Sequence, residues 1–193
     1  PIAGVFEVNP VDGAGDINGD GYDDLLVGST RWNELDDNGA ALIYFGSASG
    51  LNTTPDIIIN GEADRSKFGI EIAGNGDING DGFKDIVVRS PYYDVVDCFS
   101  VSAYFVYYGT LAGLNVIPDT IYGPPTTGTS WIQVDIAGDI NNDSFDDVVV
   151  GNIDIQPENI GYAYYYYGSA DGIIPTPAFS IKGHQLAAQF GYS

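Results

Sequence analysis

The chain has 193 residues, a net charge of −21 at pH 7 and a hydrophobic fraction of 44%, with 14 Tyr and 26 Gly residues. This charge argues against nucleic acid or an anionic membrane as a partner, because both repel a polyanion. The apolar content argues against disorder, and no apolar run approaches the roughly 18 residues of a membrane-spanning helix. The many Val, Ile, Tyr and Gly residues favour strands joined by tight turns.

A carboxylate-rich nonapeptide occurs three times along the chain. Its copies read D-I-N-G-D-G-Y-D-D at 16–24, D-I-N-G-D-G-F-K-D at 77–85 and D-I-N-N-D-S-F-D-D at 139–147. The copies begin 61 and then 62 residues apart, and an apolar run follows each of them. A fixed period of this length is typical of repeat architectures, so we predict successive structural repeats.

Four short strands are predicted in each repeat, because β-branched and aromatic runs alternate with Gly and Pro. The first strand precedes the nonapeptide and is expected at Val5–Val8, Phe68–Ala73 and Trp131–Val134. The second strand follows the nonapeptide at Asp24–Ser29, Asp85–Ser90 and Asp147–Asn152. The third is expected at Ala40–Phe45, Ala103–Tyr108 and Ala163–Tyr167, and the fourth at Ile57–Asn60, Thr120–Tyr122 and Phe179–Lys182.

The turn after each third strand has the same spacing in every repeat. A Gly ends the strand, a second Gly follows four residues later and a Pro nine residues later. Invariant offsets of Gly and Pro indicate a fixed turn geometry. Four strands per repeat in series predict an all-β fold of β-propeller-type blades, and a β-solenoid is the alternative. We expect one repeat domain, 1–193, with approximate repeats 1–61, 62–123 and 124–183 and the start of a fourth at 184–193.

Each nonapeptide predicts a calcium site. Asp or Asn stands at positions one, three and five, and Asp stands at position nine. Position seven adds a backbone carbonyl, so the flexible loop offers up to six oxygen ligands. Such a loop suits Ca²⁺ better than Mg²⁺, which is smaller and needs a more rigid geometry. Zinc is not expected, because the single His and the single Cys, His184 and Cys98, stand 86 residues apart. We therefore expect about three Ca²⁺ ions, one per repeat. The predicted ligands are Asp16, Asn18, Asp20, Tyr22, Asp24, Asp77, Asn79, Asp81, Phe83, Asp85, Asp139, Asn141, Asp143, Phe145 and Asp147.

The third loop differs from the others at position six, where Ser144 replaces Gly21 and Gly82. We expect a positive φ there, which costs Ser roughly 1 kcal/mol against Gly, so the third site should be the weakest. The aromatic side chain at position seven should point into its own blade. An EF-hand is not expected, because each copy has Val at position twelve, where that motif needs Glu. The alternative is an Asx-rich turn without an ion.

These features together resemble an FG-GAP repeat. The resemblance is carried by Phe68-Gly69, by the D-x-N-x-D-G-x-x-D loop at 77–85 and by the following I-V-V-x-S-P at 86–91. It covers nearly the whole chain in three copies. It implies the seven-bladed β-propeller of integrin alpha subunits and of many bacterial surface and secreted proteins. It also implies a cation cage made by loop positions one, three, five, seven and nine.

The leading functional hypothesis is a non-catalytic, calcium-stabilised module for adhesion or self-assembly, with a protein partner or copies of itself. Weak Asp-rich sites suit millimolar extracellular calcium, so an extracellular or cell-surface location is expected. The alternative is a carbohydrate-binding or carbohydrate-active propeller of the lyase or hydrolase type. That alternative rests on the tyrosines at 162 and 164–167 and on spare loop carboxylates, whereas packing between blades and solvated turns explain the same residues more simply. The spare carboxylates are Asp36, Asp37, Asp94 and Asp97.

Three repeats are fewer than the four to eight blades of most propellers. Phe190–Ser193 resembles the start of the segment that precedes a further nonapeptide. Two explanations follow: the chain is an excerpt of a longer propeller, or chains associate head to tail into a ring or a fibre.

Overall fold

The computed structural model describes residues 10–31, 38–62, 65–96, 99–122, 131–153 and 161–184. The regular elements in these ranges are all strands, and none of these residues forms a helix long and apolar enough to cross a membrane. The strands build three four-stranded antiparallel sheets and one short hairpin.

Each four-stranded sheet is a meander in chain order. The first sheet consists of β1 (Val11–Gly15), β2 (Asp24–Ser29), β3 (Ala40–Tyr44) and β4 (Ile57–Asn60). The second consists of β5 (Ile72–Gly76), β6 (Asp85–Val96), β7 (Phe99–Tyr107) and β10 (Asp119–Tyr122), with the hairpin β8 (Gly109–Thr110) and β9 (Gly113–Leu114) before β10. The third consists of β11 (Trp131–Gly138), β12 (Asp147–Ile153), β13 (Tyr162–Tyr166) and β14 (Phe179–Lys182).

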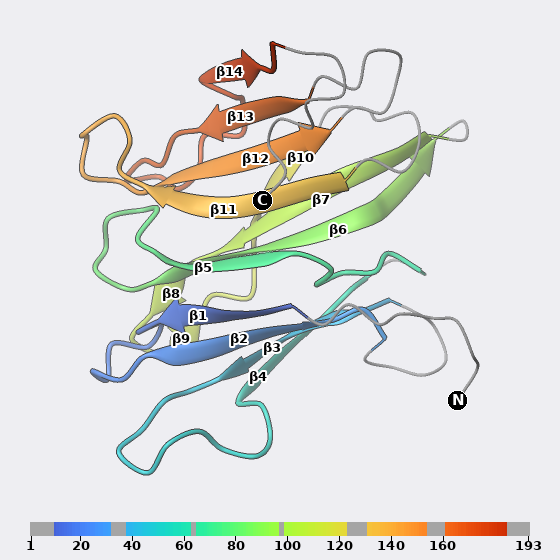
Figure 1. Ribbon diagram of the computed structural model, residues 1–193. Coiled ribbons are helices and arrows are strands. Elements are labelled where there is room, and N and C mark those ends of the chain that lie inside the picture. The colour runs from blue at the N-terminus through green and yellow to red at the C-terminus, as the bar shows by residue number, and fades with distance from the viewer. Residues whose placement is uncertain are drawn as a thin grey trace.

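The three sheets stack on one another in chain order (Figure 1). Their first strands lie side by side, since β5 contacts both β1 and β11. One hydrophobic cluster joins the first and second sheets and includes the fully buried Leu26 and Ile86. Another joins the second and third sheets and includes the fully buried Val87 and Val148. This arrangement of four-stranded meanders is that of consecutive propeller blades, and it confirms the predicted fold class.

The second sheet is covered on both faces. Ile86, Val87 and Val88 follow one another on β6, and all three are fully buried. Successive side chains of a strand point to opposite faces, so Ile86 and Val88 pack toward the first sheet and Val87 toward the third. On β14, by contrast, Phe179 and Ile181 are each 40% exposed. β6 therefore buries side chains on both of its faces because a sheet packs against each of them.

The predicted second, third and fourth strands are confirmed in every repeat, although β6 and β7 extend beyond the predicted ends by several residues. The prediction of the first strands is partly wrong. These strands end directly before the nonapeptides, at Gly15, Gly76 and Gly138, so that β5 overlaps the predicted strand only at its start. The segments Val5–Val8 and Phe190–Ser193 lie outside the described residues.

β1 and β5 were not placed correctly by the sequence because they are rich in glycine. A Cβ placed on Gly74 would lie 2.9 Å from Ala14 Cα, and one on Gly76 would collide with Ile136 of β11. Glycine has a low strand propensity, but the first strands approach one another so closely that side chains do not fit at these positions. Packing between sheets therefore overrides local propensity.

Candidate metal centre

The three nonapeptides form the loops that join the first and second strands of each sheet. All three loops lie along one edge of the stack, at the left of Figure 1. The Ile at position two anchors the first two loops, because Ile17 and Ile78 are fully buried, whereas Ile140 of the third loop is 43% exposed. The structure thus places the fifteen predicted ligands in three equivalent turns at one face.

The carboxylate at position one organises each loop. Its Oδ1 accepts the N–H of position five at 3.0 Å in all three loops. Its Oδ2 accepts the N–H of position six at 2.8 Å, 3.0 Å and 2.9 Å in chain order. This side chain thereby holds the backbone in a turn around itself. The carboxylates concerned are Asp16, Asp77 and Asp139.

The side chains at positions three and five contact each other in every loop. The Asn Nδ2 donates to the Asp Oδ2 at 3.3 Å, 3.0 Å and 2.8 Å. The Oδ1 of the same Asp accepts the N–H of position seven at 3.0 Å in each case. The predicted ligands at positions three and five are therefore brought together. The pairs are Asn18 with Asp20, Asn79 with Asp81, and Asn141 with Asp143.

The carboxylate at position nine is buried and ties the loop to the third strand. One oxygen accepts the N–H of position two at 2.7–3.0 Å. The other oxygen accepts, at 2.8–3.1 Å, the N–H of the Gly that stands two residues after the end of the third strand. The invariant spacing of that Gly along the chain does not reveal this partner. The pairs are Asp24 with Gly46, Asp85 with Gly109, and Asp147 with Gly168.

Burial makes these position-nine carboxylates hard to ionise. Desolvation raises the pKa of Asp85 to about 7; the two backbone N–H groups oppose this rise, and the charges of Asp81 and Asp77 add to it. Desolvation likewise raises the pKa of Asp24 and of Asp147. A cation close to such a carboxyl would favour its charged form.

Positions four and six have left-handed backbone conformations in every loop. At position six φ is 91° for Gly21, 93° for Gly82 and 78° for Ser144, which confirms the predicted positive φ. At position four the third loop has Asn142 with a φ of 62°. Asn adopts this conformation more readily than most residues, and Ser does so less readily. The third loop thus keeps the shape of the others at a cost in backbone strain.

The donor set of each loop fits a hard cation, because it consists of oxygen atoms in an exposed turn. The described residues nevertheless contain no group of three or more His, Cys, Asp or Glu side chains that converges as around a bound metal. The position-one carboxylates are instead turned toward the N–H groups of their own loops. Calcium and its ligands therefore stay a prediction.

Neighbouring loops also bind each other. The position-one carbonyl of Asp16 accepts the N–H of Lys84 at 3.1 Å, and that of Asp77 accepts the N–H of Asp146 at 3.0 Å. The position-four glycines Gly19 and Gly80 lie beneath the position-seven ring of the next loop, where a Cβ would collide with it. The rings are those of Phe83 and Phe145.

The predicted orientation of the position-seven ring is therefore wrong. The rings of Phe83 and Phe145 do not point into their own blades but cover the preceding loop. The reason lies in the stacking of the sheets, which brings successive loops side by side so that a glycine in one leaves space for the ring of the next. Tyr22 of the first loop, which has no described loop before it, is 44% exposed.

Comparison with known proteins agrees with this geometry. The model of the FG-GAP repeat matches residues 11–44 and 71–108, which contain the first two loops and the strands around them. These segments are FG-GAP repeats. The FG-GAP repeat is the blade of a β-propeller, in agreement with the four-stranded sheets described above.

The chain is also similar to integrin alpha subunits over most of its length. It is 31% identical to human integrin alpha-6 over 169 residues, which cover 88% of this chain and 14% of that protein. It is 31% identical to mouse integrin alpha-3 over 174 residues, covering 88% of this chain and 16% of that protein. For integrin alpha pat-2 of Caenorhabditis briggsae the identity is 27% over 195 residues, covering 93% and 16%. The chain thus spans about a sixth or less of the length of these relatives.

His184 is exposed beyond β14, and Asp36, Asp37, Asp97 and Cys98 lie outside the described residues. For Asp94 the structure gives only the backbone pairing on β6.

The tyrosines of β13 have packing roles. Tyr164 and Tyr166 pack toward the second sheet, and the ring of Tyr165 stacks on Phe179 with centroids 4.4 Å apart. These contacts support the interpretation that the tyrosine run packs within and between blades.

Proposed function

We propose that this chain is a calcium-stabilised, non-catalytic repeat module of an extracellular adhesion protein. The observation that carries the proposal is the presence of three loops with one hydrogen-bond geometry and one set of oxygen side chains, in a chain that contains FG-GAP repeats. The similarity to proteins named integrin alpha supports an adhesion role and a protein partner. Millimolar extracellular calcium is sufficient to fill weak Asp-rich sites.

Calcium would stabilise the fold through the charges that each loop collects. Positions one, five and nine are carboxylates within nine residues, and the position-nine group is almost completely buried. A divalent cation would compensate their mutual repulsion and the cost of burying a charge. Because each loop is hydrogen-bonded to the next, an ion that orders one loop would also support its neighbour.

The Ser144→Gly substitution should tighten calcium binding at the third loop. Ser144 adopts a φ of 78°, which costs a residue with a Cβ roughly 1 kcal/mol, and glycine removes that cost. Titration calorimetry should show about three ions for the unmodified chain and an affinity gain of about fivefold for the weakest site of the variant. Asn142→Gly is the matched control, with a smaller gain because Asn tolerates its φ of 62°. Unchanged affinity in Ser144→Gly would show that position six does not limit binding.

We further propose that the outer face of the third sheet binds a second copy of the chain. Ile121 of β10 and Ile181 of β14 occupy equivalent places, two residues before the Gly that follows the fourth strand. The third sheet covers Ile121 completely, whereas Ile181 is 40% exposed beside the partly exposed rings of Tyr165 and Phe179. Apolar side chains that are buried in one blade and open in the next mark a face suited to a further blade.

Replacing Ile181 with Lys should weaken this association. Burying an Ile side chain contributes about 1.5–3 kcal/mol, so the dissociation constant should rise by about tenfold or more. Light scattering across a concentration series measures the effect. Leu111→Lys serves as the control, because Leu111 is 81% exposed at the tip of the β8–β9 hairpin, on another part of the surface. Equal association of both variants and the unmodified chain would contradict the proposed face.

A further inference from the structure

A pocket of about 240 Å³ lies between the first and second sheets, away from the loops described above. Its wall is aromatic and is formed by Phe68, Phe105 and Tyr107. The ring of Phe68 lies 5.6 Å from that of Phe105, inclined at 54°, and 6.5 Å from that of Tyr107, inclined at 88°. Rings at such angles form a concave apolar corner rather than a flat platform.

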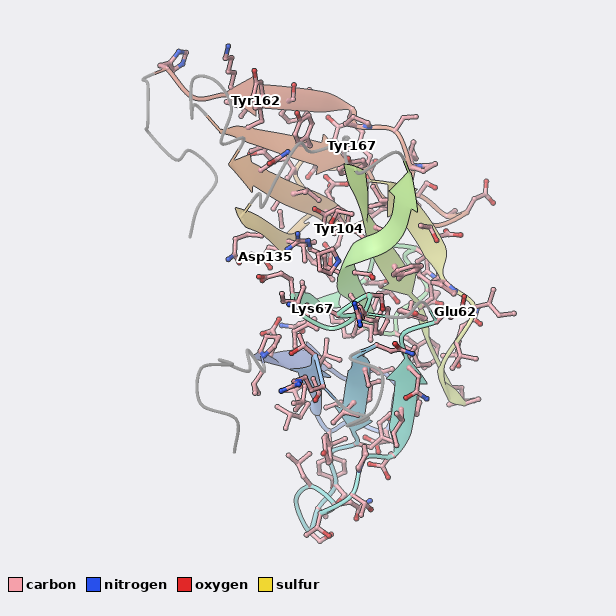
Figure 2. The ribbon with its side chains drawn as sticks, turned by 90° about the vertical axis from the view of Figure 1, so that its right-hand side faces the viewer. Glu62, Lys67, Tyr104, Asp135, Tyr162 and Tyr167 are labelled. Atoms are coloured by element: carbon pink, nitrogen blue, oxygen red, sulfur yellow. The ribbon has the colours of Figure 1, made fainter. Side chains whose placement is uncertain are left out.

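Polar groups complete the lining of this pocket. Asn60 and Glu62 come from β4 and the turn after it, and Thr120 comes from β10 of the second sheet. Figure 2 shows Glu62 between the first and second sheets. Within the described part of the chain, the side chains of these three residues and the hydroxyl of Tyr107 have no hydrogen-bond partner. Four side chains that can donate or accept hydrogen bonds thus lie at one place together with the aromatic rings.

The surroundings of Tyr107 settle the protonation state of its hydroxyl. Burial raises the pKa of Tyr107, and the charge of Glu62 adds to the rise. The Tyr107 hydroxyl therefore stays protonated at neutral pH and can donate a hydrogen bond. Glu62 is exposed and can accept two. The pocket accordingly offers acceptors from Glu62 and Asn60, donors from Tyr107 and Asn60, and the hydroxyl of Thr120, which can do either.

This combination fits one class of small ligand better than others. A sugar ring presents an apolar face of C–H groups, which packs on aromatic rings, and a rim of hydroxyls, which bind carboxylate, amide and hydroxyl groups. The volume suits a single ring, because it lies below the range of about 300–1,000 Å³ for drug-sized ligands. The net charge of −21 and the Glu62 carboxylate disfavour acidic sugars.

We propose that the pocket between the first and second sheets binds one neutral or amino sugar residue of a glycan. The carboxylate of Glu62 accepts hydrogen bonds from two hydroxyls, or from the ammonium group of an amino sugar. The aromatic corner holds the C–H face of the ring, and the Tyr107 hydroxyl fixes its orientation. This binding requires neither calcium nor self-association, so it goes beyond the function proposed above.

The test is a titration of the intact chain with methyl glycosides of glucose, galactose, mannose, glucosamine and N-acetylglucosamine. Saturation-transfer NMR detects binding, and chemical-shift titration measures the dissociation constant. At least one glycoside should bind, and Glu62→Gln and Tyr107→Phe should each weaken it by about fivefold or more, because each leaves a sugar hydroxyl without its partner. Asp171→Asn is the control of equal charge change at an exposed turn of the third sheet, and it should leave the affinity unchanged.

The proposal would be overturned if none of these glycosides binds, or if neither Glu62→Gln nor Tyr107→Phe weakens the binding. Tetramethylammonium is titrated as a cation without a sugar ring. If it alone binds, the pocket is a cation site and the proposal is also overturned. Melting curves of both variants show whether the fold is kept. Repeating the titration with chelator separates this proposal from the calcium proposal. Sugar binding without calcium-dependent melting would refute the calcium function alone, and the converse result would refute the sugar site alone.

Discussion

Addition of a calcium chelator should lower the melting temperature of this chain by about 10 °C or more. An ion that binds only the native state at a hundred times its dissociation constant contributes about 2.7 kcal/mol per site. For a domain of about 200 residues, each kcal/mol corresponds to about 2–4 °C. With three loops of the same donor set, even partial occupancy should produce a large shift. Thermal unfolding at fixed ionic strength, with calcium and with chelator, measures it.

One loop can be tested by removing the charge at its first position. The Asp77 carboxylate accepts the N–H groups of Asp81 and Gly82 at 3.0 Å, each through a different oxygen. Asp77→Asn therefore keeps one of these hydrogen bonds, loses the other and removes the charge. In calcium this variant should melt about 5–10 °C below the unmodified chain, because one site is lost. In chelator it should melt much closer to the unmodified chain, because the removal of one repelling charge offsets the loss of one hydrogen bond.

A deficit in melting temperature that is large in calcium and small in chelator separates an ion ligand from a purely structural carboxylate. Asp77→Ala removes the acceptor as well and should lower the melting temperature in both conditions. The control is Asp171→Asn, which changes the same charge at an exposed turn outside the loops. A melting temperature that responds to neither calcium nor chelator would exclude calcium as a stabilising ion.

Most of the blade structure was predictable from local sequence, and the features that were predicted wrongly share one cause. The second strands were found because runs such as Ile86, Val87 and Val88 are β-branched and bounded by turn residues. β5 was misplaced because its glycines reflect contact with the neighbouring sheets, as at Gly74 and Gly76. Propensity describes a strand by itself, whereas these glycines are explained only by a neighbour about 60 residues away in the chain.

In the loops, too, local features were predictable from the sequence, and contacts between repeats were not. The positive φ at Ser144 was predicted from the nonapeptide alone. The orientation of Phe83 was not, because its ring covers Gly19 of another repeat. The role of Asp85 as the partner of the Gly109 N–H also required the fold, since 24 residues separate the two. The pocket at Glu62 combines side chains from two sheets, and no sequence motif predicts it.

Replacing Gly109 with Ala should be one of the most destabilising single substitutions in the chain. Gly109 does not have a positive φ, so the cost comes from contact and not from backbone conformation. A Cβ there would collide with the carbonyl of Lys84 and would lie 2.7 Å from the carbonyl oxygen of Ile17 and 2.9 Å from Phe83 Cβ. Backbone of two neighbouring loops would have to move, and the hydrogen bond from the Gly109 N–H to the buried Asp85 would be strained.

We expect Gly109→Ala to lose about 3 kcal/mol, equivalent to about 6–12 °C in melting temperature. Gly13→Ala on β1 is the matched control, since a Cβ there meets nothing within 4 Å and φ is not positive. That substitution should be neutral or slightly stabilising, because Ala loses less conformational freedom on folding than Gly.

Gly168→Ala should resemble Gly109→Ala, because its Cβ would lie between Asp146 and Ile78 of two loops. Gly46→Ala should cost less, because its Cβ would meet only the first loop, at Tyr22 and Asp23. Equal melting temperatures for Gly109→Ala and Gly13→Ala would mean that neighbouring loops are not packed as the structure shows, and that the loops act independently of one another.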